Sequence, residues 1–229
     1  MDAPRPIEHP LLPNRPLDVA TAAALAFATF VFFLLVAFDG TRLWVQGIDN
    51  WFLPEIVARR ADTVTDVAKL FNVLGMVAVM VPVRLIVAGF LAWRRRWWHL
   101  GAFAAAIVAS EALIGPLKLL FARPRPPLSL ALVATSGASF PSGHAVAASV
   151  TVVALVLALF PTGPHRWAWG VAAAVFSLAM AVSRAYLAAH WLSDAAAGAL
   201  LGTTIALGSA VVVQRIRDTR TLRRPLAAA

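Results

Sequence analysis

The sequence predicts an all-α integral membrane protein, a bundle of six transmembrane helices forming a single domain over residues 1–229. The first observation behind this prediction is composition. Of the 229 residues, 60% are hydrophobic and 14% are charged, and the mean hydropathy is +0.77. These values are too apolar for a soluble domain of this length. The second observation is the spacing of the apolar runs, which are about as long as a bilayer is thick and are separated by polar segments.

The net charge of +9 raises the question of a nucleic-acid partner. The arginines, however, stand mainly at the ends of apolar runs, which is the pattern of cytoplasmic anchoring under the positive-inside rule. We therefore expect no nucleic-acid partner. The chain has no cysteine, which excludes disulfides and thiol chemistry and leaves the compartment undetermined by redox arguments.

The first part of the chain predicts a lead, an anchor and an interfacial segment. Residues 1–17 are rich in proline and are expected to form a disordered cytoplasmic lead in which His9 has no role. The run Asp18–Phe38 is long enough to cross the bilayer and shows no convincing cleavage site, so it predicts an uncleaved first helix. Residues 39–66 mix charged residues with tryptophans, which favours an amphipathic segment along the extracytoplasmic interface.

The remaining apolar runs predict five more crossings. The second helix, Val67–Trp93, is interrupted by Pro82 and Arg84 and ends on the basic and aromatic belt 94–98, which we expect at the cytoplasmic face. Four further helices are expected at His99–Phe121, Gly143–Phe160, Trp167–Val182 and Leu192–Val213, with a proline-rich loop at 122–141. In the last helix, Gly198 and Gly202 are spaced to let another helix approach closely.

A carboxylate inside an apolar helix is unusual, and Glu111 is one. Such a group is costly at membrane depth and normally has a partner. Arg84 is the candidate, because both residues lie roughly 15 to 20 Å from the cytoplasmic ends of adjacent antiparallel helices at about 1.5 Å per residue. The alternative is that Glu111 is neutral and packs against a helix of small residues.

The distribution of lysine and arginine predicts the orientation. Eleven lie in the proposed cytoplasmic segments and eight on the opposite side. The triple arginine of the belt and the basic tail 215–229 favour both termini inside a bacterial-type plasma membrane. The loops after the first, third and fifth helices then share the extracytoplasmic face.

Three charged clusters follow from that topology, and all three fall on the extracytoplasmic side. They supply cations that can hold a phosphoryl group, two histidines, and a carboxylate placed to orient a histidine. No acidic cluster of the kind that holds magnesium accompanies them. The residues are Lys118 and Arg125 in the first cluster, Ser142, Gly143 and His144 in the second, and Arg184, His190 and Asp194 in the third.

Other interpretations of these residues exist. An isolated histidine with an aspartate four residues later is often a structural pair. Two histidines and an aspartate can also bind a metal, but three cations directed at the same place would repel a divalent ion. We therefore expect no metal and no cofactor. Arg123 lies beside the first cluster, and we expect it to be solvated or to face lipid headgroups.

The three clusters resemble the signatures of the type 2 phosphatidic acid phosphatase superfamily, which are K-x6-R-P, P-S-G-H and S-R-x5-H-x3-D. All three occur in order, at Lys118–Pro126, Pro141–His144 and Ser183–Asp194. A single P-S-G-H would be weak evidence, whereas three signatures within a six-helix hydropathy pattern are very specific. The motifs cover about 77 residues, and the hydropathy pattern covers nearly the whole chain.

The resemblance implies a metal-independent phosphatase that works through a phosphohistidine. His190 would be the nucleophile, and Asp194 would accept a hydrogen bond from its other ring nitrogen. His144 would protonate the leaving group and later activate water. The phosphoryl oxygens would be held by Lys118, Arg125, Arg184, Ser142 and the backbone N–H groups near Gly143.

Three functions are compatible with these features. The first is a phosphatase acting on a membrane lipid, with undecaprenyl diphosphate, phosphatidic acid and phosphatidylglycerophosphate as candidate substrates. The second is a lipid-linked phosphotransferase that uses the same site. The third is a transporter with a cationic centre, which is disfavoured because the clusters lie at helix ends and no inverted repeat is visible. The choice of lipid and the oligomeric state are left open.

Overall fold

The structure is a computed structural model that describes residues 9–12 and 16–223. This part of the chain is helical and contains no strand, which confirms the predicted all-α class. The elements are α1 (Pro16–Ala37), α2 (Asp39–Ala58), α3 (Asp62–Leu74), α4 (Val77–Trp93), α5 (Trp97–Phe121), the 3-10 helix η1 (Leu128–Leu130), α6 (Gly143–Leu159), α7 (Pro164–Tyr186) and α8 (Leu192–Arg223).

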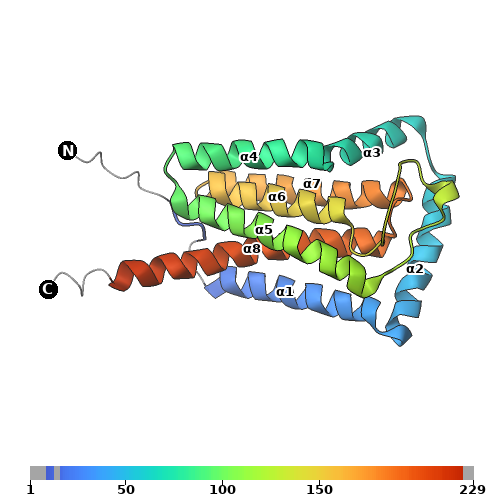
Figure 1. Ribbon diagram of the computed structural model, residues 1–229, viewed down its shortest axis with the longest axis horizontal. Coiled ribbons are helices and arrows are strands. Elements are labelled where there is room, and N and C mark those ends of the chain that lie inside the picture. Colours follow the sequence, from blue (N-terminus) through green and yellow to red (C-terminus); the bar gives the residue numbers. More distant parts are fainter. Residues whose placement is uncertain (1–8, 13–15, 224–229) are drawn as a thin grey trace.

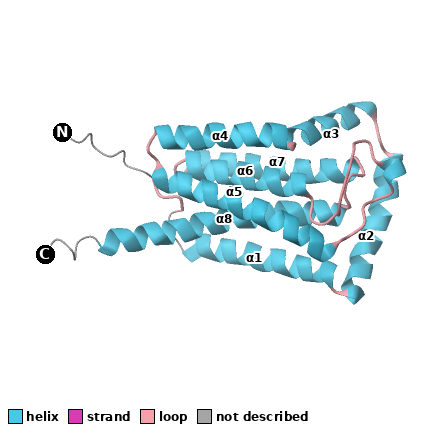
Figure 2. Cartoon of the chain, in the orientation of Figure 1, coloured by secondary structure: helices cyan, strands magenta, loops and turns pink. Residues whose placement is uncertain are grey.

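Six helices run lengthwise beside one another, and α2 lies across one end of them (Figure 1). The central helix is α6, which packs most extensively against α8 and also against α5 and α7. The long loop between α5 and α6 lies at the end that α2 covers, which we term the site end (Figure 2). Helix α1 begins, and α8 ends, at the opposite end.

The lengths of the helices agree roughly with six crossings. Four described helices are long and apolar enough to span a membrane, namely α1, α5, α7 and α8. The pair α3 and α4, bent by 54° at a short break, would make a fifth span. Helix α6 is apolar but has 17 residues, which corresponds to about 25 Å. It lies among the other helices as a sixth, shorter crossing.

The surface of the bundle is apolar, as expected for a protein surrounded by lipid. In α1 only 11% of the membrane-length window is buried, although its mean hydropathy is 2.5. Large side chains such as Val77 on α4 and Leu119 on α5 are 76% and 83% exposed. Because lipid is as apolar as these side chains, the helices associate through close packing rather than through a hydrophobic driving force between them.

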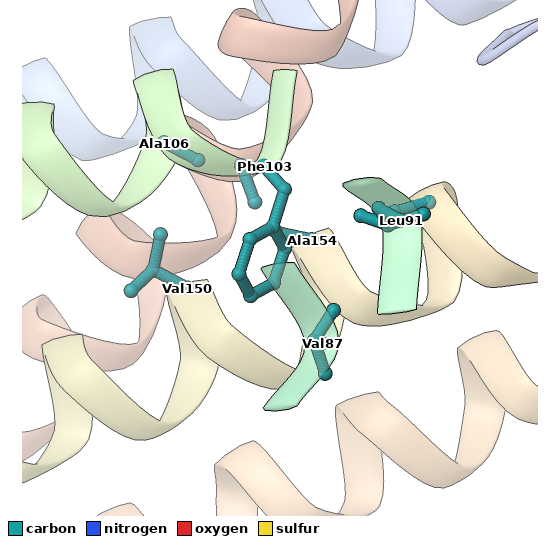
Figure 3. Packing of buried hydrophobic residues seen from close by; sticks show 8 residues of the cluster. Val87, Leu91, Phe103, Ala106, Val150 and Ala154 are labelled. Carbon is teal, nitrogen blue, oxygen red and sulfur yellow. The ribbon is translucent and has the colours of Figure 1, made fainter. Parts of the chain in front are cut away.

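The interior contains one cluster in which α4, α5 and α6 meet. Phe103 of α5 is 2% exposed and lies between Val87 of α4 and Ala154 of α6 (Figure 3). The cluster combines this large ring with several alanines, and it includes Ala206 of α8. Small residues around a bulky one let four helices approach without leaving a void.

The predicted close approach at Gly198 and Gly202 is confirmed. A Cβ on Gly198 would lie 2.7 Å from the carbonyl oxygen of Ser142, and a Cβ on Gly202 would lie 2.6 Å from that of Val146. No side chain fits at such distances, so the backbones of α6 and α8 touch directly. The first turn of α6 is thereby held against α8 near the site end.

The second predicted helix is wrong in its limits. It begins earlier, at Asp62, and it is broken at Gly75 and Met76 rather than interrupted at Pro82 and Arg84. Met76 has extended backbone, with ψ 149°. A Cβ on Gly75 would lie 2.6 Å from Cδ2 of His144. The break therefore occurs where only a glycine leaves room for a histidine of the second cluster.

The two ends of the chain extend the helical bundle further than the sequence predicted. Residues 1–8 and 13–15 of the expected lead lie outside the described residues. Residues 9–12 are packed, since Leu11 is 0% exposed and its N–H donates to Oε1 of Gln214 at 2.9 Å. The basic tail is helical as far as Arg223, because residues 214–223 contain good helix formers and neither proline nor glycine.

Candidate active site

The first cluster stands where α5 ends and the long loop begins. Ala122 ends the helix in the left-handed conformation, with φ 41°, and so turns the chain toward the bundle. The loop then folds back, because the N–H of Ser139 donates to the carbonyl of Arg123 at 2.8 Å. Nζ of Lys118 donates to the carbonyl of Ala138 at 2.6 Å. The last turn of α5 and both ends of the loop thus form one unit.

Arg125 connects this loop to the third cluster. Its guanidinium donates to the carbonyls of Ser136 and Gly137 at 2.7 and 2.9 Å. Nη1 donates to the carbonyl of Ala189 at 2.5 Å and lies 3.2 Å from Nε2 of His190. The structure therefore brings the first and third clusters into direct contact, as the topology predicted.

His190 lies in the turn between α7 and α8 and is 3% exposed. Burial is the largest influence on the pKa of His190 and lowers it to about 4. The Arg125 and Arg184 charges also lower this pKa, while Asp194 opposes them. The imidazole is consequently neutral at physiological pH, which is the form that has a nucleophilic nitrogen.

The expected direct hydrogen bond between His190 and Asp194 is not formed in this geometry. Nδ1 of His190 is 3.8 Å from Oδ2 of Asp194. The hydroxyl of Ser139 donates to the same carboxylate oxygen and lies 3.4 Å from Nδ1. Ser139 therefore mediates between the two groups. This network favours a proton on Nδ1, which leaves the lone pair of Nε2 on the side of Arg125.

The second cluster opens α6 at the site end. Ser142 is the N-cap residue, but its side chain makes no capping hydrogen bond, and the first N–H groups of a helix have no partner within it. Among the described residues, the buried atoms without a hydrogen-bond partner include Oγ of Ser142, Nε2 of His144 and Nε of Arg184. Unsatisfied donors beside a helix N-terminus are suited to binding an anion such as a phosphate.

The expectation for Arg123 is wrong. Its side chain is 5% exposed, and it bridges two carboxylates that are 0% exposed, at 2.7 Å from Asp49 and 2.6 Å from Asp194. It also donates to Ser193 and Gln46, each at 2.7 Å. A buried guanidinium requires such partners. Arg123 thus fixes the remaining oxygen of Asp194, while Ser139 holds the first.

Sequence reasoning missed four further residues that hold the site. Asp49 of α2 accepts hydrogen bonds from the backbone and the hydroxyl of Ser193. Asn72 of α3 accepts one from Arg184. None of these residues, nor Ser139, stands within a signature at a motif position. The only available signal was that Asp49 and Asn72 are polar residues placed among apolar ones in segments next to the membrane.

The predicted pair of Arg84 and Glu111 is confirmed. Nη1 of Arg84 lies 2.6 Å from Oε1 of Glu111, with the Arg84 side chain 10% exposed and the Glu111 side chain 56% exposed. Nε of Arg84 also donates to the hydroxyl of Thr151 at 2.9 Å. The pair lines a cavity of about 610 Å³ between α4, α5 and α6, which reaches Gly143 and His144.

The described residues contain no group of three or more His, Cys, Asp or Glu side chains placed to hold a metal ion. Independence from metals stays a prediction. The charge that a metal would supply is available from three cations at the site, on Lys118, Arg125 and Arg184.

A helical membrane bundle whose site end gathers these cations around a neutral histidine defines a phosphatase embedded in the membrane. The family comparison agrees, since residues 97–218 match the PAP2 superfamily. This match covers more than half of the chain, and the chain belongs to that superfamily.

Three relatives extend the match. Phosphatidylglycerophosphatase B of Bacillus subtilis (strain 168) is 27% identical over 178 residues, which cover 76% of this chain and 87% of that protein. A crystal structure of a transmembrane PAP2-type phosphatidylglycerolphosphate phosphatase from Bacillus subtilis has a TM-score of 0.73 at 22% identity, over 86% of this chain and 96% of the other. Aquifex aeolicus LpxE gives 0.57 at 23% identity, over 69% and 92%. At these identities, the two structures support the fold.

Proposed function

We propose that the protein hydrolyses the phosphate or diphosphate group of a membrane lipid at the site end of the bundle. The observation that carries this proposal is the position of His144. It lies beside the unpartnered polar atoms of the site and also lines the apolar cavity between α4, α5 and α6. A substrate that occupied both places would have a phosphate at one end and a hydrocarbon portion at the other.

The proposed reaction begins at His190. Nε2 attacks phosphorus while the bond from phosphorus to the lipid oxygen breaks, giving a phosphohistidine. His144 donates a proton to the departing oxygen. Because Nδ1 of His190 faces Ser139 and, beyond it, Asp194, the positive charge that develops on the ring is stabilised.

The second half of the reaction releases phosphate. Water attacks phosphorus, His144 accepts its proton, and the bond between phosphorus and nitrogen breaks, which restores the neutral imidazole. Lys118, Arg125 and Arg184 stabilise the phosphoryl oxygens in both steps. The carbonyl contacts of Arg125 keep its guanidinium beside His190 before a substrate arrives.

The lipid substrate is supported by two relatives whose names specify phosphatidylglycerophosphate or phosphatidylglycerolphosphate. We further propose that the termini are cytoplasmic and that the site end is extracytoplasmic. This orientation is supported by the basic residues near the end at which α1 begins and α8 ends.

The test is phosphate release by the purified protein, with a chelator present, from phosphatidic acid, phosphatidylglycerophosphate, undecaprenyl diphosphate and a soluble phosphate ester. We expect at least one lipid to be hydrolysed, and the His190→Ala variant to be inactive on all of them. Hydrolysis of the soluble ester alone, or of lipids equally well by His190→Ala, would refute the proposal.

A further inference from the structure

The Arg84 and Glu111 pair lies outside the three signatures, and it also lies below the site where phosphate would bind. Its position is fixed by α6, since Arg84 contacts the carbonyl of Ala147 at 3.4 Å and the hydroxyl of Thr151 at 2.9 Å. Ala147 and Thr151 follow His144 by three and seven residues. At about 1.5 Å per residue, these contacts lie roughly 5 to 10 Å farther along the helix than His144.

The surroundings of the pair are otherwise apolar. Val77, Met80, Val81, Leu85, Ile107 and Ile114 form most of the cavity wall. Ionised groups at such a depth are costly and usually have a functional reason. A pair that served only to hold α4, α5 and α6 together would be expected to be shielded on both sides, yet the Glu111 side chain is 56% exposed.

The pair offers hydrogen-bond donors without net charge. Arg84 has N–H groups on Nη1 and Nη2 beyond those that contact Glu111 and Ala147. Because Glu111 neutralises the guanidinium, a phosphate is not attracted to this depth in preference to the three cations at the site end. An uncharged acceptor, such as a carbonyl oxygen, suits these donors better.

We infer that the Arg84 and Glu111 pair is a specificity-determining contact that selects lipid phosphates with ester-linked chains. In a glycerolipid phosphate, the ester carbonyls follow phosphorus by about five covalent bonds, on the order of 6 Å. This distance matches the depth of Arg84 below His144. A lipid with only hydrocarbon at that depth leaves the remaining donors of Arg84 unpaired when it fills the cavity, which is unfavourable. This inference rests on the proposed lipid phosphatase function.

The first test compares phosphatidic acid with its dialkyl ether analogue, which has the same phosphate, leaving group and chain lengths but lacks both carbonyls. The measured quantity is the ratio of kcat/KM for the ester to kcat/KM for the ether in mixed micelles. We expect a ratio of about 10 for the wild type, the effect of one hydrogen bond to a charged group. In the Arg84→Met/Glu111→Met variant, the ratio should fall to about 1 by the same reasoning.

The matched control removes an ion pair that lies outside the cavity. Arg59 and Glu55 of α2 form an exposed pair at 2.7 Å, and the Glu55→Gln/Arg59→Gln variant should keep the wild-type ratio. A wild-type ratio near 1 overturns the inference. The same holds if the Arg84→Met/Glu111→Met variant keeps the wild-type preference.

A second measurement needs no variant, so it stands even if the double substitution prevents folding. Two alkyl phosphates of equal length each carry one ester carbonyl, placed about five or about twelve bonds from phosphorus. We expect the near carbonyl to give about 10-fold higher kcat/KM. Equal values would overturn the inference and leave the lipid phosphatase proposal intact, whereas failure to hydrolyse any lipid phosphate would overturn the proposed function itself.

Discussion

Replacing Arg123 with methionine tests whether the buried network behind the candidate active site is as important as its geometry implies. The substitution keeps a long side chain but removes the cation between Asp49 and Asp194. Both carboxylates are 0% exposed and lie within 2.7 Å of the guanidinium. Removing one partner of a buried ion pair typically costs about 3 to 5 kcal/mol, since the charge left behind is uncompensated. We expect a loss of unfolding free energy in that range.

The same substitution should reduce catalysis in the fraction that remains folded. Arg123 holds one oxygen of Asp194, and Ser139 connects the other to His190. A shift of about 1 Å at a nucleophile costs on the order of 100-fold in rate. We therefore expect kcat to fall by about 10- to 100-fold with little change in KM, because Arg123 does not touch the substrate.

The assay is unfolding by a denaturing detergent in micelles, followed in parallel with hydrolysis of a lipid phosphate. Arg42→Met is the matched control, because Arg42 pairs with Asp39 at 2.9 Å while both side chains are largely exposed. Exposed ion pairs contribute little, so this variant should behave as the wild type. If Arg123→Met lost no more stability and activity than Arg42→Met, the buried network would not have the role that its geometry suggests.

Four further predictions concern the chemistry and the topology. Activity should survive EDTA, because side-chain cations replace a metal; loss of activity that a divalent ion restores would contradict this. Protonation of His190 removes its nucleophilic lone pair, and its pKa is lowered to about 4, so the acid limb of kcat/KM should lie near pH 4 and the rate should fall as pH decreases through it; a limb near the ordinary histidine value of about 6.5 would show that His190 is not desolvated. His144→Ala should impair hydrolysis of phosphatidic acid, whose alkoxide leaving group needs a proton, more than hydrolysis of a diphosphate, and a labile phosphoryl label that His190→Ala retained but His144→Ala lost would invert the two roles. In intact cells, a cysteine at exposed Ser129 should react with an impermeant maleimide and one at exposed Thr162 should not; the reverse labelling would overturn the orientation.

The parts of the fold that the sequence predicted well depend on local composition. The apolar runs identified α1, α5, α6, α7 and α8 within a few residues at most ends, because a membrane span needs about 20 apolar residues and little else. The meeting of the three clusters at one end followed from the parity of the crossings. The pairing of Arg84 with Glu111 followed from their similar depth in adjacent antiparallel helices.

The errors have a different origin, because they concern contacts between segments far apart in the chain. Arg123 was expected to be solvated, since nothing in the neighbouring sequence shows that Asp49, 74 residues earlier, would pack against it. The break at Gly75 depends on the space needed by His144, which no local propensity reveals. Ser139 lacks a signature position of its own, and its role follows only from the fold of the loop that carries it.

The contact of α8 with α6 has a consequence for how the protein could acquire new substrates. Gly198 and Gly202 bring the two backbones together below the site, and His144 and His190 stand near the adjoining ends of these helices. The span across which a phosphoryl group passes is therefore gauged by an interior contact in which no surface loop takes part. Residues 39–66 and 122–141 can then vary, in natural relatives or by engineering, to admit other lipids while that span stays constant.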